Sequence, residues 1–272
     1  MAIGESFIKT VAFVGTPVPD KRLVGTGFFV AVPSDQYSGA DHAYIVTAAH
    51  VVRTFPDTFV RLRKTDGSVD DAAIDDWHFH PTQDVAVANF PVNPHDYDVV
   101  VVPRSMFADV IPHRPLLGEQ LYFIGLLGQV EAMGQTGTPM VRTGTLGALA
   151  QDQVPMSEPD GTTRRMRGHL IDCRSFGGFS GAPCFMNLVR NTGRTERMGL
   201  TFPESHPTLL GVLGGHFDHR TTLRMPDGSG TLSAPTSAGI GVVYPVEVLV
   251  ESLEMDELVE ERLQAGPPPD LA

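Results

Sequence analysis

The sequence predicts an all-β protein that ends in an α-helix. Short runs rich in Val, Ile, Phe and Thr recur between Gly, Pro and Asp residues, which is the pattern of strands separated by turns. About six such runs precede a Pro-containing stretch that follows Phe90, and about six come after it. Short strands at regular spacing favour a sandwich or a barrel.

The runs form two sets, one on each side of the Pro-containing stretch. Turn-forming residues bound each run, so each is expected to form one strand. In the first set we expect strands over 6–14, 23–32, 43–48, 57–64, 72–79 and 85–90. In the second set we expect them over 120–125, 140–149, 168–173, 182–188, 208–214 and 239–244.

The remaining segments are predicted as two loops and one helix. Residues 151–167 and 217–237 are polar and contain Pro, Asp and Gly, so we expect loops there. We expect the helix over 246–264. Its apolar residues recur at helical spacing at Val246, Leu249, Val250 and Leu253. The tail over 265–272 contains consecutive prolines and cannot extend the helix.

Composition excludes several classes of protein. The 272 residues are 42% hydrophobic and 19% charged, which is too apolar for a disordered chain. The net charge of −12 argues against a general nucleic-acid binder. Two cysteines cannot build a disulfide framework or a four-thiolate zinc site.

The sequence also bears on the compartment. No apolar run reaches the roughly 18 residues of a membrane-spanning helix. Glu5 and Lys9 interrupt the place where the apolar core of a signal peptide would lie. We therefore expect a cytoplasmic protein that has no membrane partner and keeps Cys173 and Cys184 as reduced thiols.

Three segments carry residues suited to chemistry. His50 follows the expected strand 43–48 after the small residue Ala49, and Asp84 opens the apolar run to Phe90. Ser180 lies in a glycine-rich turn between two predicted strands. Taken singly, each has an ordinary structural explanation: a packed histidine, a capping aspartate and a tight turn. Their combination favours acyl transfer instead.

The chemistry follows from the residue types. A serine hydroxyl needs a base to take its proton, and a histidine has a pKa near neutrality. A carboxylate on the other ring nitrogen holds the tautomer and stabilises the imidazolium. Glycines beside the serine allow backbone N–H groups to converge on one point. The candidate oxyanion-hole donors are the N–H groups of Gly178 and Ser180.

Four motifs carry a resemblance to a known family. They are Gly25-Thr26-Gly27-Phe28, Thr47-Ala48-Ala49-His50, Asp84-Val85-Ala86-Val87 and Gly178-Phe179-Ser180-Gly181-Ala182-Pro183. Together they resemble the trypsin/chymotrypsin-like serine peptidases, particularly the bacterial HtrA-like and glutamyl-endopeptidase-like branch. The order His, Asp, Ser also matches, with separations of 34 and 96 residues. The resemblance implies two six-stranded antiparallel β-barrels with the active site in the cleft between them.

This resemblance implies a domain organisation. No PDZ-like domain is expected, because too few residues follow the helix. The expected parts are an N-terminal barrel over 1–98 with His50 and Asp84, a linker over 99–118, a C-terminal barrel over 119–245 with Ser180, the helix over 246–264 and the tail over 265–272.

Two departures concern activation and specificity. Phe179 precedes the serine where secreted trypsins have an Asp that binds the processed N-terminus, so we expect no activation by such processing. Packing of Phe179 into the second barrel and regulation through loop disorder both remain open. The family's specificity pocket corresponds here to Arg174, Ser175, Gly214, Gly215 and His216. Arg174 and His216 would favour an acidic substrate residue if both point inward, whereas Arg174 otherwise faces solvent or pairs with Asp172.

The leading hypothesis is a regulated or narrow-specificity serine endopeptidase of the cytoplasm. It would act through His50, Asp84 and Ser180 and an acyl-enzyme, with no metal or cofactor. Its expected partners are a protein or peptide substrate and a regulatory protein, not nucleic acid. The alternatives are a catalytically silent binding or scaffold module and a hydrolase of non-peptide esters or amides. Cys173 and Cys184 flank the serine loop, either as small buried side chains or as a redox-controlled bridge.

Overall fold

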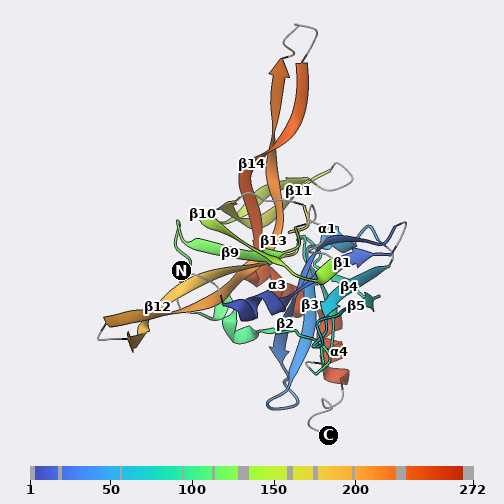
Figure 1. Ribbon diagram of the computed structural model, residues 1–272, viewed down its shortest axis with the longest axis vertical. Helices are drawn as coiled ribbons and strands as arrows, with labels where there is room; N and C mark the ends of the chain where they lie inside the picture. The colour runs from blue at the N-terminus through green and yellow to red at the C-terminus, as the bar shows by residue number, and fades with distance from the viewer. Residues whose placement is uncertain are drawn as a thin grey trace.

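The computed structural model describes most of the chain. Residues 1–3, 18–19, 56, 94, 112–113, 128–134, 158–161, 174–176, 198–199, 225–230 and 266–272 are not described. Within 187–206 and 218–237 the description covers the strands alone. The fold is all-β with helices at the C-terminus, as the sequence predicted (Figure 1).

The N-terminal half is one sheet of eight strands. Its hydrogen-bonded order is β5-β4-β1-β2-β3-β7-β6, and β8 pairs with β2. This path does not close, so the first of the two expected barrels is open between β5 and β6. The strands are β1 (Val11–Thr16), β2 (Arg22–Pro33), β3 (Asp41–Thr47), β4 (Thr58–Arg63), β5 (Val69–Ile74), β6 (His78–Phe79), β7 (Ala86–Asn89) and β8 (Val102–Pro103). Short helical turns interrupt it: η1 (Glu5–Thr10), α1 (Ala49–Val52), η2 (Arg104–Met106) and η3 (Ala108–Val110).

The C-terminal half is a closed barrel of six strands, as expected for the second barrel. Its order is β10-β11-β14-β13-β12-β9, and every described pairing is antiparallel. The strands are β9 (Gln120–Gly125), β10 (Met140–Ser157), β11 (Thr163–Asp172), β12 (Pro183–Arg197), β13 (Leu200–Arg224) and β14 (Thr231–Pro245).

The largest hydrophobic core joins the two halves. Side chains alternate between faces along a strand, so Phe28 packs into this shared core while Phe29 packs inside the first sheet. In the same way Tyr122 joins the shared core, and Leu121 and Phe123 fill the second barrel. The halves are therefore held together by apolar packing, which fixes the positions of the residues at their junction.

Three predictions of local structure are wrong, two loops and the start of one strand. The expected loops 151–167 and 217–237 are largely strand, because β10 runs on to pair with β11 and β13 runs on to pair with β14. The Pro-Asp-Gly residues of both segments lie outside the described residues. The β12–β13 and β13–β14 hairpins project from the barrel in Figure 1. The expected strand 6–14 begins only at Val11, after η1.

The single predicted C-terminal helix is two helices. α3 (Val246–Leu253) is followed by its C-cap Glu254, and α4 (Asp256–Gln264) starts after Met255, whose backbone is extended. Asp256 and Glu257 favour a new helix start there, because acidic side chains stabilise a helix N-terminus. No helix of the described residues is long and apolar enough to cross a membrane.

Candidate active site

His50 lies where β3 gives way to a short helix. The strand ends at Thr47, Ala48 keeps an extended conformation, and α1 begins at Ala49. Ala48 and Ala49 are fully buried, and they pack in one apolar cluster with Val51 of α1. The His50 side chain keeps 29% of its surface exposed. This turn thus fixes the backbone of His50 and leaves its ring open to solvent.

Asp84 is held by a loop organised around a second histidine. His80 is buried, and its Nδ1 accepts N–H groups from Thr82 at 3.2 Å and Gln83 at 3.0 Å. Its Nε2 lies 3.2 Å from a carboxylate oxygen of Glu251 on α3. Burial lowers the pKa of His80, so the imidazole is neutral at pH 7 and Nδ1 serves as the acceptor. The same Glu251 binds Arg167 of β11 at 2.7 Å, which fastens the loop to the second barrel.

The two side chains form a tight pair. His50 Nδ1 lies 2.6 Å from Asp84 Oδ2, and the His50 backbone N–H donates to Oδ1 at 2.7 Å. The Asp84 side chain is 6% exposed, so the carboxylate is shielded from water. Because a carboxylate only accepts, Nδ1 carries the proton and Nε2 is left as a base.

A tyrosine supplies a third hydrogen bond to Asp84. The Tyr244 hydroxyl, fully buried at the end of β14, donates to Oδ2 at 3.3 Å. A Cβ on Gly214 would lie 2.3 Å from the Tyr244 ring, so only glycine leaves room for it. The Cβ direction of Gly214 is therefore filled by Tyr244.

Ser180 lies in a tight turn between β11 and β12. Gly178 and Gly181 have φ angles of 102° and 84°, which favour glycine. The Ala182 N–H donates to the Phe179 carbonyl at 2.9 Å, and the Gly181 N–H donates to Leu213 at 2.7 Å. Phe179 is 1% exposed and packs into the core of the second barrel, one of the two arrangements expected from the sequence.

The serine turn is docked against the segment that carries His50. The Ser180 carbonyl accepts the Thr26 N–H of β2 at 2.9 Å. A Cβ added to Gly181 would lie 2.3 Å from Thr47 Oγ1 and 2.9 Å from the Ala48 nitrogen. Ser180 and His50, 130 residues apart in the numbering, are thereby brought to one junction between the halves.

The candidate oxyanion-hole donors lie in this same turn. Each peptide's N–H points opposite to its carbonyl, so the bond from Ala182 to the Phe179 carbonyl also sets the direction of the Ser180 N–H. Within the described part of the chain, the N–H groups of Gly178 and Ser180 donate to no protein acceptor.

The remaining specificity-pocket candidates are only partly described. Arg174 and Ser175 lie outside the described residues. Gly215 is half-buried beside Met156, whose methyl carbon would lie 2.9 Å from an added Cβ. His216 is exposed on β13.

The two cysteines are buried thiols of the second barrel. Both are unbridged. Burial raises the pKa of Cys173 to about 11 and raises that of Cys184 well above its ordinary value. Both are therefore protonated at neutral pH and weakly nucleophilic.

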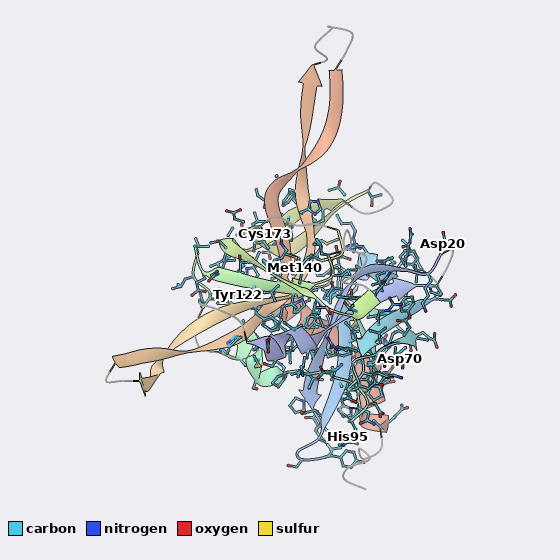
Figure 2. The ribbon with its side chains drawn as sticks, in the orientation of Figure 1. Asp20, Asp70, His95, Tyr122, Met140 and Cys173 are labelled. Carbon is cyan, nitrogen blue, oxygen red and sulfur yellow. The ribbon has the colours of Figure 1, made fainter. Side chains whose placement is uncertain are left out.

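Other histidines lie away from this junction. Figure 2 shows His95 near one end of the molecule, well apart from Cys173, which precedes the serine loop. His78 faces Asp76 at 3.7 Å and Glu261 of α4 at 3.2 Å, so it links the first half to the C-terminal helix. The ligand atoms of these three side chains lie close enough together to approach a common cation, and both carboxylates lie beside the His78 ring.

A buried histidine predicts sensitivity to acid. His169 of β11 is 6% exposed, and burial lowers its pKa to about 4. The unfolded chain binds this proton near pH 6.5. The free energy of unfolding should therefore fall by about 3 kcal/mol between pH 6.5 and 4 through this group. His169→Leu should flatten that part of the profile.

Denaturant titrations across this pH range measure the effect. His95→Leu replaces an exposed histidine and is the matched control, which should keep the parent profile. An unchanged slope in His169→Leu would show that another group carries the acid sensitivity.

The sequence did not predict three residues that hold the site in place: Thr26, Tyr244 and His80. Thr26 lies in the motif Gly25-Thr26-Gly27-Phe28, and Tyr244 lies in the expected strand 239–244. The weak signal for Tyr244 is the glycine at 214, since a buried tyrosine hydroxyl needs room and a partner. The only sequence signal for His80 is its position four residues before Asp84.

The fold and the site together define a class of enzyme. A histidine–carboxylate pair on one β-half and a serine turn on the other lie at the same junction, in the chain order His, Asp, Ser of chymotrypsin-like hydrolases. Residues 25–190, more than half of the chain, match the family model of the trypsin-like peptidase domain. The chain belongs to that family and is a trypsin-like serine protease.

Solved structures agree with this fold. The apo protease domain of MamO from Magnetospirillum magneticum has a TM-score of 0.54 at 16% identity, covering 92% of this chain and 99% of that one. The active form of the Rv3671c protease from M. tuberculosis scores 0.52 at 17%, covering 96% and 83%. Human heparin binding protein scores 0.50 at 11%, covering 99% and 98%. No curated protein matches the chain significantly.

Proposed function

We propose that this protein is an active serine endopeptidase whose triad is His50, Asp84 and Ser180. The observation that carries the proposal is the short contact between His50 Nδ1 and Asp84 Oδ2, at 2.6 Å, beside a docked serine turn. A purely structural role does not require a buried carboxylate to orient a half-exposed histidine. Peptides and proteins are the substrates that the family implies.

The geometry supports a two-step hydrolysis. His50 Nε2 takes the proton of the Ser180 hydroxyl as Oγ attacks the peptide carbonyl carbon. The oxyanion accepts hydrogen bonds from the N–H groups of Gly178 and Ser180. The imidazolium then protonates the leaving nitrogen, the C–N bond breaks, and an acyl-enzyme ester remains. His50 next deprotonates a water that attacks the ester, which releases the acid and restores Ser180.

The substrate preference remains a separate proposal. An acidic residue before the scissile bond would be favoured by Arg174 and His216. What supports it is the exposure of His216 on β13, three residues after Leu213, whose carbonyl accepts the Gly181 N–H of the serine turn. The net charge of −12 opposes long-range attraction of acidic substrates, so the preference would depend on local charge.

We also propose a reducing compartment, the cytoplasm, as its place of action. The support is the pair of buried, unbridged thiols at Cys173 and Cys184. Burial keeps both protonated, which slows their oxidation. A regulatory protein partner stays a prediction, because an unrestrained protease would damage its own cell.

A peptide library tests activity and preference together. The parent should cut library peptides, whereas Ser180→Ala should leave them intact, because the variant lacks the nucleophile. The cleaved sequences should be enriched in Asp or Glu before the cut. Cleavage by both proteins would assign the activity to a contaminant or another residue, and a profile without acidic enrichment would remove the Arg174 and His216 proposal.

A further inference from the structure

Thr26 of β2 is the most connected polar residue at the junction of the halves. It is fully buried and uses all of its hydrogen-bonding groups. Its hydroxyl donates to the Gly178 carbonyl at 2.7 Å and accepts the Leu126 N–H at 2.9 Å. Its own N–H donates to the Ser180 carbonyl at 2.9 Å. Its carbonyl accepts the Thr47 hydroxyl at 2.7 Å.

These bonds fix the peptide planes around the nucleophile. The Thr26 hydroxyl holds the plane after Gly178, and the Thr26 N–H holds the plane after Ser180. The Ala182 N–H holds the plane between Phe179 and Ser180. Three consecutive planes are thus set, two of them by one residue of the opposite half.

The residues around the serine turn explain why Thr26 holds it in place. Phe179, which precedes the nucleophile, is apolar and cannot anchor the turn through an ion pair. Gly125 lets the threonine approach, because an added Cβ there would lie 2.7 Å from Thr26 Oγ1 and 3.2 Å from the Phe179 ring. The Phe179 ring and the Thr26 hydroxyl therefore both lie against Gly125.

We propose that the Thr26 hydroxyl is a positioning residue that holds the oxyanion hole of the serine turn in its working geometry. The inference rests on the proposed function of Ser180. It assigns the ordering of the turn to contact between the two halves, with no processed N-terminus taking part. The catalytic turn of the second barrel then keeps its geometry only while β2 of the first half is docked against it.

The test is the rate of reaction with a fluorophosphonate, measured per labelled site as a function of pH. Thr26→Val keeps the shape of the side chain but removes both bonds of the hydroxyl. Its plateau rate constant should fall roughly 100-fold, in the range seen when one oxyanion donor is lost. The pH midpoint should stay at the parent value, because the His50–Asp84 pair is untouched.

Three variants complete the design. Thr26→Ser keeps the hydroxyl and should stay within about threefold of the parent rate. Thr26→Ala should repeat the loss if Thr26→Val folds poorly. Thr10→Val is the matched control, since Thr10 is buried and its hydroxyl donates to the Phe7 carbonyl at 2.8 Å, away from the serine turn. It should keep the parent rate.

The outcomes separate this inference from the proposed function. Misfolding lowers the labelled fraction and leaves the rate per labelled site unchanged, so a purely structural role for Thr26 would show that pattern and overturn the inference. Parent-like rates in both Thr26→Val and Thr26→Ala would overturn it as well. A parent protein that fails to react at all would instead refute the proposed function.

Discussion

Gly181→Ala is expected to lower the fluorophosphonate rate constant of this protease by about 100-fold or more. The added Cβ would lie 2.1 Å from the Thr26 carbonyl oxygen and 2.3 Å from Thr47 Oγ1. Neither atom can move away easily, because the Thr47 hydroxyl donates a hydrogen bond to the Thr26 carbonyl at 2.7 Å. The serine turn must therefore move away from the segment that carries His50. Displacements of about 1 Å suffice for losses of this size.

Backbone strain alone does not account for the expected loss. Gly118→Ala is the matched control, because Gly118 has a φ of 87° against 84° for Gly181, and a Cβ there meets nothing within 4 Å. That variant should lose about 1 kcal/mol of stability and keep the parent rate. A Gly181→Ala protein with the parent rate would contradict the close docking of the turn.

Asp84→Asn is expected to lower the rate constant roughly 10⁴-fold, as the same change does in another His-Asp-Ser triad. Asp84 accepts from three donors, the His50 N–H, His50 Nδ1 and the Tyr244 hydroxyl. An asparagine must turn its NH₂ group toward at least one of them. Either His50 changes tautomer, which removes the base at Nε2, or a buried donor loses its partner.

Tyr244→Phe serves as the graded comparison for Asp84→Asn. It removes one of the three hydrogen bonds and keeps the ring that packs over Gly214. Its effect should be far smaller than that of Asp84→Asn and should include a shift in the pH midpoint, because the carboxylate beside His50 changes. Asp84→Asn with a rate within tenfold of the parent would remove Asp84 from the triad.

Sequence patterns predicted strands well where turn residues bound them tightly. β9 runs over Gln120–Gly125, the predicted range, because a turn ending at Gly118 precedes it. The hairpins formed by β10–β11 and β13–β14 were missed. Their polar residues resemble loop composition, and strand pairing beyond the barrel depends on the partner strand, which local composition does not report.

The candidate site divides in the same way. His50, Asp84 and Ser180 lie in short motifs whose chemistry is visible locally. The residues that position them act over long separations: Tyr244 lies 160 residues from Asp84, and Thr26 lies 152 residues from Gly178. Such contacts depend on how the two halves dock, so a pattern confined to one segment cannot reveal them.

The central claim is that Ser180 is the activated nucleophile of a working protease. The most direct measurement is to label the parent and Ser180→Ala with a fluorophosphonate and to identify the modified residue by peptide mass mapping. We expect one modified residue, Ser180, in the parent and none in the variant. Absence of labelling in the parent, under conditions where a control protease reacts, would contradict the claim, as would labelling that persists in Ser180→Ala.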